Sequence, residues 1–434
     1  MRRIAIVFAV AASAAVYASS TEAERNWPQW RGPLNNGVGP KANPPLEWSE
    51  SKNIKWKVEI QGRGSSTPVV WGDRIFLTTA IPAGTAGPKS HEPLGGVTPR
   101  NTHRFVVLAI DRKTGKTIWE RVAREEVPHE ATHQDNGTWA SSSAVTDGEV
   151  VIASFESRGI HAFDLAGKPV WQVDLGKKRM RNEFGEGSTP ALHGNLLVVV
   201  WDHQGESFVA ALDKRTGKEV WRQKREEIDT WATPLVVEHD GRAQVVVSGM
   251  NRVRSYDLET GKLVWQTAGV TMNPIPSPVA GDGMVFVTSG FRGNSLKAIR
   301  LADAKDDAAD SKAIAWSLDR DTPYVPSPLL YDGVLYILKT NNGLLSAFDA
   351  KSGAAHYLVQ RLEKAPNVFA SPVGANGRVY IPGRDGTTVV LRHGPKFEIL
   401  AENTLDDGFD ASAALVDNEI FLRGYKNLYC IASD

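Results

Sequence analysis

The stretch Asp111-Arg-Lys-Thr-Gly115-Lys-Thr-Ile-Trp119 decides the fold, because the chain repeats it. An aspartate opens a turn, a glycine closes it, and a tryptophan follows on the next apolar segment. The other copies are Asp164–Trp171, Asp213–Trp221, Asp257–Trp265 and a weaker one at Asp349–Tyr357. A fixed period of roughly 40–50 residues, with four short strands in each unit, predicts a β-propeller.

Each unit follows the same plan from its first residue. It opens with a Ser/Thr-Pro pair and continues with an apolar strand, a tight turn and a second apolar strand, as in Thr67–Leu77. A third strand then leads to the Asp-x-x-Thr-Gly turn, and a fourth carries the tryptophan. The proline, or an alanine in its place, falls at Pro68, Ala144, Pro190, Pro234, Pro278, Pro328, Pro372 and Ala413. The sequence therefore predicts an all-β, eight-bladed propeller of four-stranded blades.

The last unit, Ala411–Ile431, ends after its third strand. The missing strand is found near the N-terminus, as Ile54–Ile60. Pairing the first and last segments in one sheet would leave no open edge between the two ends of the ring. We therefore expect an N-terminal strand to close the last blade. The predicted domains are a signal peptide over 1–18, an N-terminal extension over 19–52 and the propeller over 53–434.

The N-terminus has the features of an export signal. Met1-Arg2-Arg3 is followed by the apolar run Ile4–Ala18, which is shorter than the ~20 residues that a spanning helix needs. Cleavage after Ala18 would give a periplasmic or secreted protein without a membrane span, and an uncleaved anchor is the alternative. Cys430 is the single cysteine, so no internal disulfide can form. We expect this side chain to be buried in the last strand.

Charge and the tryptophan spacing limit the choice of partners. The chain has 50 Lys and Arg residues against 50 Asp and Glu, which gives no electrostatic basis for binding nucleic acid. We expect a monomer.

Six tryptophans share one repeat position: Trp56, Trp119, Trp171, Trp221, Trp265 and Trp316. They could form a ligand platform, but their regular spacing favours packing between neighbouring blades.

The repeat Ala/Phe-x-Asp-x-x-Thr-Gly-Lys-x-x-Trp resembles the pyrroloquinoline-quinone (PQQ)-type propeller repeat over Trp56–Ile431. The segments Trp27–Pro33 and Gly62–Pro68 are similar to those of an exported bacterial subgroup. The resemblance implies one of two functions. Quinoprotein dehydrogenases use PQQ and calcium, whereas the propeller lipoprotein of the outer-membrane barrel assembly machinery binds partners and catalyses nothing. The chain departs from both, because it lacks the adjacent cysteine pair and Cys-x-x-Cys-His haem site of the former and the lipid-bearing cysteine of the latter.

The residues just before each Ser/Thr-Pro pair are expected at one mouth of the central channel. The candidate binding residues there are Arg63, Trp139, Glu186, Trp231, Asn273, Tyr324, Asn367 and Asp410. The aromatic rings could stack on a flat polar ligand, while Arg63 would pair with a carboxylate and Asn273 would form hydrogen bonds. The alternative is a water-filled channel whose polar groups satisfy one another.

Histidines cluster in the first long insertion. His129 and His133 are four residues apart, a spacing that on a helix would let both bind one metal ion, with Glu130 or Asp135 adding an oxygen. Pro128 and the polar residues that follow indicate a loop instead. His129 and His133 are therefore a metal-site hypothesis only.

Two functional hypotheses follow. The first is a non-catalytic binding or scaffold protein of the cell envelope, which needs no cofactor. An envelope protein or a small polar ligand would dock on its loop-rich channel face or along exposed strands. The alternative is a PQQ-dependent oxidoreductase with calcium, in which the quinone at the channel mouth takes hydride from a substrate. Arg63 and Asn273 would then orient the quinone, and Asp229 or Glu186 would act as the base.

Overall fold

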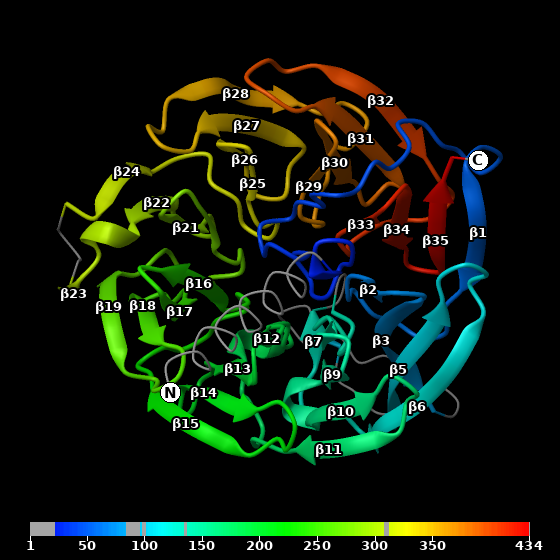
Figure 1. The fold of residues 1–434 in the computed structure, drawn as a ribbon, viewed down its shortest axis with the longest axis horizontal. Coiled ribbons are helices and arrows are strands. Elements are labelled where there is room, and N and C mark those ends of the chain that lie inside the picture. Colours follow the sequence, from blue (N-terminus) through cyan, green and yellow to red (C-terminus); the bar gives the residue numbers. More distant parts are fainter. Residues whose placement is uncertain (1–21, 84–95, 98–100, 134–136, 308–311, 434) are drawn as a thin grey trace, which may run out of the picture.

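The structure is a computed structural model and describes residues 22–83, 96–97, 101–133, 137–307 and 312–433. The predicted signal peptide (1–18) and Asp135 lie outside these residues. Eight antiparallel sheets stand around a central axis as the blades of a ring (Figure 1). Each has four strands, and the fourth blade gains a fifth. The prediction of an all-β, eight-bladed propeller is confirmed.

The strands of each blade run from the axis outward. Blade 1 is β2 (Val69–Trp71), β3 (Arg74–Pro82), β5 (His103–Asp111) and β6 (Thr117–Glu126); blade 2 is β8 (Val145–Thr146), β9 (Val150–Ser154), β10 (Ile160–Asp164) and β11 (Pro169–Val173). Blade 3 is β12 (Ala191–His193), β13 (Leu196–Trp201), β14 (Phe208–Asp213) and β15 (Glu219–Lys224); blade 4 is β16 (Leu235–His239), β17 (Arg242–Val247), β18 (Arg252–Asp257) and β19 (Leu263–Ala268). 

The second half of the ring follows the same order. Blade 5 is β20 (Val279–Gly281), β21 (Met284–Ser289), β22 (Ser295–Arg300) and β24 (Ile314–Leu318); blade 6 is β25 (Leu329–Tyr331), β26 (Val334–Leu338), β27 (Leu344–Asp349) and β28 (Ala355–Arg361). Blade 7 is β29 (Val373–Ala375), β30 (Arg378–Pro382), β31 (Thr387–Arg392) and β32 (Ile399–Thr404). Blade 8 is β33 (Ala414–Val416), β34 (Glu419–Arg423), β35 (Asn427–Ala432) and, at its outer edge, β1 (Ile54–Glu59).

Short elements lie in the connections between these strands. They are β4 (Gly96–Val97), β7 (Thr132–His133), β23 (Asp306–Asp307) and the 3₁₀ turns η1 (Glu156–Arg158), η2 (Arg181–Glu183) and η3 (Leu301–Asp303). β4 and β7 pair with each other, and β23 adds to the outer edge of blade 4. No helix within the described ranges is long and apolar enough to cross a membrane.

The closure of the ring is as predicted. β1 pairs antiparallel with β35, in a register that sets Ile54 opposite Ile431 and Trp56 opposite Cys430. The Cys430 side chain is fully buried in this sheet. The first and last strands of the propeller thus share blade 8, where the blue β1 lies beside the red β35 in Figure 1.

Neighbouring blades are joined by a repeated contact between an indole ring and a turn. The tryptophan of one blade lies on the glycine of the next blade's aspartate–glycine turn, which reads Asp-x-x-Thr-Gly in three blades, Asp164-Leu-Ala-Gly167 in blade 2 and Asp349-Ala-Lys-Ser-Gly353 in blade 6. A Cβ on that glycine would come within 2.6–2.8 Å of the ring. The pairs are Trp56 with Gly115, Trp119 with Gly167, Trp171 with Gly217, Trp221 with Gly261 and Trp316 with Gly353. Each indole Nε1 also donates to the carbonyl after the turn's aspartate, at 2.7–3.0 Å.

Glycine is required at these positions for two reasons. The backbone adopts φ between +69° and +81°, and the indole ring leaves no room for a side chain. The predicted role of the tryptophans in packing between blades is therefore confirmed at five junctions. Trp265 is the exception, since its Nε1 donates to Gln244 Oε1 of its own blade at 3.0 Å. Blade 5 has the 3₁₀ turn η3 and β23 where the Asp-x-x-Thr-Gly turn would stand, and β23 pairs with Trp265 instead.

Strand alternation gives the ring two different faces. The first-to-second and third-to-fourth strand turns of every blade lie on one side, which we call the hairpin face. The longer second-to-third and blade-to-blade connections lie on the other, the loop face. The N-terminal extension enters the channel from the hairpin face, where the Asn26 Oδ1 accepts a hydrogen bond from the Gly72 N–H at 2.8 Å. Asn43 N–H donates to the Asp417 carbonyl at a second hairpin.

Inside the ring the extension is held by buried contacts. Arg31 donates to the carbonyls of Pro328 at 2.8 Å and Pro372 at 3.1 Å, which belong to blades 6 and 7. Gly374 of β29 exchanges backbone hydrogen bonds with the extension. Trp48 then stacks on Tyr380, with ring centroids 6.4 Å apart. Figure 1 shows this blue segment crossing the centre of the ring.

Removing the closing strand should unfold the whole ring. We expect a chain that begins at Gln61 to lose its near-ultraviolet circular dichroism and its cooperative thermal transition, because β35 would lose its partner and the channel its extension. The control is a chain that begins at Ser19, the predicted mature start, which should keep both. A cooperative transition in the shorter chain would contradict the role of β1.

Trp221→Ala should destabilise the protein by about 3–5 kcal/mol, because it deletes a buried ring and the hydrogen bond to Leu258. Urea unfolding followed by fluorescence measures the change. The matched control is the adjacent Val220→Ala, whose side chain is 51% exposed and whose loss should change stability by no more than about 0.5 kcal/mol. Equal effects of the two substitutions would contradict the contact.

Candidate functional site

A chain of hydroxyl groups surrounds the axis at the start of the innermost strands. In seven junctions the backbone N–H of one blade's Ser/Thr donates to the hydroxyl of the next blade's Ser/Thr, at 2.8–3.2 Å. We call these residues the hydroxyl ring: Thr67, Ser143, Thr189, Thr233, Ser277, Ser327, Ser371 and Ser412. The chain of bonds is open between blades 8 and 1, where Thr67 Oγ1 has no partner among the described residues. There the Trp30 indole donates to Ser412 Oγ at 3.4 Å.

A central pocket of about 330 Å³ lies above this ring, on the loop face. One residue of every blade lines it, and each stands two positions before the hydroxyl residue: Ser65, Ser141, Gly187, Trp231, Ile275, Val325, Phe369 and Asp410. Side chains two residues apart on an extended chain point the same way, so these groups share the axial direction of the hydroxyls. Trp30 of the extension also lines the pocket.

Five of the eight predicted mouth residues line this pocket: Glu186, Trp231, Asn273, Tyr324 and Asp410. The other three do not. Arg63 is exposed and pairs with Ala80, Trp139 donates its indole N–H to the Glu130 carbonyl at 3.2 Å, and Asn367 is exposed and pairs with Asn342. Four of the predicted residues, Arg63, Trp139, Asn273 and Asn367, stand five places before the proline position, whereas the wall is made mainly by the residue three places before it, as with Trp231 and Asp410.

Some wall residues were missed by sequence reasoning. Phe369 stands at the same repeat position as Trp231, so the repeat alignment itself held the signal. Phe184 belongs to an irregular connection, and Trp30 belongs to the extension, which lies outside the repeats. The motif Trp27–Pro33, which no repeat position explained, was the available hint of a role for Trp30.

The carboxylates of the pocket are already paired with arginines. Glu186 Oε1 accepts from Arg158 at 2.8 Å, and its Oε2 accepts from the backbone N–H and the hydroxyl of Ser157, both at 2.9 Å. Asp410 is paired with Arg384 at 2.8 Å and accepts from the Tyr425 hydroxyl at 3.1 Å. Burial raises the pKa of Asp410, although Arg384 opposes that shift.

Asp229, the other proposed base, lies outside the pocket wall. Its carboxylate accepts hydrogen bonds from the backbone N–H of Arg181 at 3.0 Å and from the Arg181 guanidinium at 3.1 Å. Burial raises the pKa of Asp229, with Arg181 acting in the opposite direction. Asp229 thus forms an ion pair with Arg181 and is not one of the residues that line the pocket.

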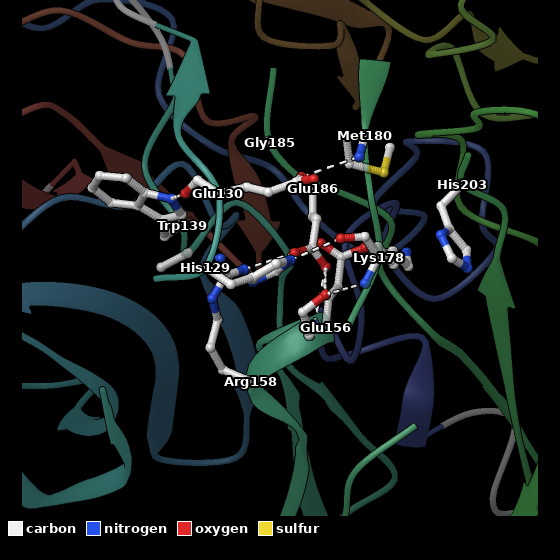
Figure 2. Close-up of polar contacts among 12 residues, drawn as sticks. His129, Glu130, Trp139, Glu156, Arg158, Lys178, Met180, Gly185, Glu186 and His203 are labelled. Carbon is white, nitrogen blue, oxygen red and sulfur yellow. Dashed lines mark hydrogen bonds and ion pairs between the residues drawn. The ribbon is translucent and has the colours of Figure 1, made fainter. Parts of the chain in front are cut away.

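A second buried ion pair supports Glu186 from behind. Lys178 donates to Glu156 Oε1 at 2.8 Å, and the same oxygen accepts the Ser188 N–H at 3.2 Å. Figure 2 shows this pair beside Glu186 and Arg158. Burial raises the pKa of Glu156 to about 7, because the loss of solvation outweighs the attraction of Lys178. The side chains that fix Glu186 are therefore themselves fixed.

The two histidines of the metal hypothesis lie on an extended segment. His129 Nε2 bonds to the Lys178 carbonyl at 2.7 Å, and the ring of His133, on β7, lies 5.3 Å from that of Phe184. The Glu130 carboxylate accepts the Met180 N–H at 3.0 Å (Figure 2). Within the part of the chain that the structure describes, no three His, Cys, Asp or Glu side chains come together as a metal site.

The described residues of the pocket wall do not supply the groups that PQQ and calcium need. PQQ carries three carboxylates, which need cationic partners, but no arginine or lysine is among the described residues that line the pocket. Calcium needs several oxygen ligands, and the oxygens of Glu186 and Asp410 are bonded to arginines. The wall instead offers hydroxyls, an amide and aromatic rings.

The ring of blades, the tryptophan–turn contacts and the central pocket define an eight-bladed propeller of the PQQ-like repeat class. The family model described as "Outer membrane protein assembly factor BamB" matches residues 46–208 and 205–391, and the chain belongs to this family.

Curated relatives that carry the name of this family are similar to the chain at low sequence identity. The outer membrane protein assembly factor BamB of Yersinia pestis is 22% identical over 315 residues, which cover 68% of this chain and 70% of that protein. BamB of Moranella endobia (strain PCIT) is 24% identical over 249 residues, which cover 51% of this chain. The chain spans 58% of the Moranella protein and 32% of the Francisella salina one.

Solved structures confirm the fold. BamB from Moraxella catarrhalis superposes with a TM-score of 0.58 at 14% identity, covering 87% of this chain and 98% of that one. The quinohemoprotein alcohol dehydrogenase from Comamonas testosteroni superposes with a TM-score of 0.62 at 12% identity, covering 96% and 82%. An outer membrane protein assembly factor and an alcohol dehydrogenase therefore share this architecture, so the fold alone does not decide the function.

The buried Glu156 should make the protein less stable as the pH rises from about 4.5 to about 7. In that interval the folded protein holds a proton that the unfolded chain has lost, so stability falls with increasing pH. Glu156→Gln should flatten this dependence by about 1–3 kcal/mol, measured by urea unfolding at pH 5 and pH 8. Glu363→Gln, whose parent side chain is 78% exposed, should leave the dependence unchanged. An unaltered slope in Glu156→Gln would contradict the assignment.

Proposed function

We propose that the protein is an exported, non-catalytic propeller that binds partner proteins in the cell envelope and acts as a scaffold there. Its membership of the BamB family supports this role, because relatives of that name are outer membrane protein assembly factors. The partner that the family suggests is a component of the machinery that assembles outer-membrane proteins. The predicted signal peptide supports a periplasmic location.

The pairing of the pocket's carboxylates is the observation that carries the proposal. A general base must present an unpaired oxygen to a substrate at a suitable pKa. Arg158, together with the Ser157 N–H and hydroxyl, occupies both oxygens of Glu186, and Arg181 holds Asp229 away from the wall. These ion pairs and hydrogen bonds hold the connections between strands in place. Loops positioned by a rigid scaffold often carry the residues that bind other molecules.

The oxidoreductase alternative draws on the likeness to the quinohemoprotein alcohol dehydrogenase and on the axial position of the pocket. The composition of the wall argues against it, since none of the described lining residues is a lysine or an arginine that could pair with a tricarboxylate. A titration distinguishes the two functions. We expect no saturable absorbance change when the purified protein receives PQQ and calcium at micromolar concentration, and no reduction of a redox dye with alcohols or sugars. Tight PQQ binding with dye reduction would overturn the proposal.

Docking should depend on the loop face. We expect the mature protein to bind the periplasmic part of the barrel-forming assembly component from the same organism, measured with purified proteins by biolayer interferometry. The triple variant Arg63→Ala, Asn367→Ala, Tyr425→Ala removes exposed loop-face side chains and should weaken binding by about tenfold or more.

The matched control changes exposed residues of the hairpin face. Lys113→Ala and Lys351→Ala lie in the Asp-x-x-Thr-Gly turns of blades 1 and 6, and the double variant should bind as the parent does. Binding lost in the control but kept in the triple variant would place docking on the opposite face. Absence of binding by the parent protein would overturn this choice of partner.

A further inference from the structure

We propose that the central pocket binds one neutral, hydroxyl-rich ring, such as a sugar or a cyclitol, at a site separate from protein docking. Three properties of the wall lead to this ligand class: a buried amide oxygen without a partner, hydroxyls whose protons remain to be donated, and aromatic rings held in place. A fourth property, the pairing of the wall's carboxylates with arginines, argues against an anionic or a cationic ligand.

The amide oxygen belongs to Asn273. This residue is 3% exposed and lines the pocket; its side chain has a hydrogen bond with Tyr324, while its Oδ1 has no hydrogen-bond partner in the described part of the chain. Its backbone adopts φ +56°, a left-handed conformation that asparagine tolerates and that fixes the direction of the side chain. A buried acceptor without a donor is unfavourable, so a ligand O–H or N–H at this position would be stabilised.

The hydroxyl ring supplies complementary groups. Ser143, Thr189, Ser371 and Ser412 line the pocket, and each hydroxyl oxygen already accepts a backbone N–H. Because a hydroxyl has one proton and two lone pairs, each of these groups can still donate. A ligand whose own hydroxyls both donate and accept matches Asn273 on one side and the ring on the other.

The aromatic side chains are held in fixed positions. The Trp231 indole N–H donates to the Gly185 carbonyl at 2.7 Å, and Tyr324 stacks on Phe291 with ring centroids 4.9 Å apart. Phe184 and Phe369 complete the apolar part of the wall. Sugar rings present C–H faces that pack on such rings and hydroxyl edges that reach the polar groups between them.

Charge argues for a neutral ligand. Glu186 and Asp410 are the acidic residues of the wall, and Arg158 and Arg384 compensate them from behind. An anion would meet these carboxylates without a lysine or arginine on the described wall, and a cation would meet no uncompensated negative charge. The volume of about 330 Å³ is at the lower end for ligand sites, which favours a ligand of a single ring.

The test uses the mature chain beginning at Ser19 and four neutral probes: glucose, N-acetylglucosamine, maltose and myo-inositol. Citrate serves as the anionic comparison and choline as the cationic one. Saturation-transfer NMR and calorimetry should show saturable binding of at least one neutral probe with a Kd of about 1 mM or tighter. No saturable binding of any neutral probe, or a clear preference for citrate or choline, would overturn the proposal.

Two variants locate the site. Asn273→Gly removes the amide while glycine accepts φ +56° without strain, and it should weaken binding by about tenfold. The matched control is Asn182→Gly, an exposed asparagine with φ +52° outside the pocket wall, which should not change the affinity. Trp231→Ala, which removes a ring of the wall, should also weaken binding. Equal affinity in the parent, Asn273→Gly and Trp231→Ala would place the ligand elsewhere and overturn the proposal.

The result is independent of protein docking. Because the Asn273 side chain is buried, Asn273→Gly should bind the assembly component as tightly as the parent does. Failure of sugar binding would therefore leave the scaffold function standing, and failure of protein docking would leave the pocket's ligand class unaffected.

Discussion

The contact between a tryptophan and the glycine turn of the next blade is the interaction on which this molecule depends. It joins a large buried surface to one directed hydrogen bond, so it fixes both the spacing and the angle of adjacent sheets. Blades 6 and 7 lack such a tryptophan, and there the N-terminal extension bridges the blades through Arg31, Gly37 and Trp48. The extension thus adds contacts at two blades where the repeated tryptophan contact is missing.

The fixed ring determines what its centre can do. The innermost strands bring one hydroxyl and one wall residue from each blade to the axis. The charged groups nearby are used to hold connections in place, as with Glu186 and Arg158. Among the described lining residues, the two carboxylates are paired with arginines, an arrangement that accords with the proposed binding function. A quinohemoprotein alcohol dehydrogenase has a similar fold, and the function of such a propeller therefore depends on the residues placed at its centre.

The fold could be predicted from the sequence because its determinants are local and repeated. Asp111, Gly115 and Trp119 recur at a fixed spacing, and the unpaired third strand of blade 8 required the strand at Ile54. Only part of the candidate site could be predicted from the sequence. Trp231 and Asp410 follow the repeat, but the arginine partners Arg158 and Arg384 come from second-to-third strand connections. Nothing in the linear sequence pairs those connections with the pocket, and Trp30 reaches it only through the path of the extension.

The pairing of β1 with β35 has a consequence for how the protein is made. A ribosome releases the first strand long before it synthesises the last, so Ile54 emerges with its partner Ile431 still missing. Until then its edge can pair with the wrong strand or with another chain. The final blade can therefore close only after its last strand has been synthesised. A truncated translation product cannot seal its sheet, and it would be exposed to proteases that spare the finished ring.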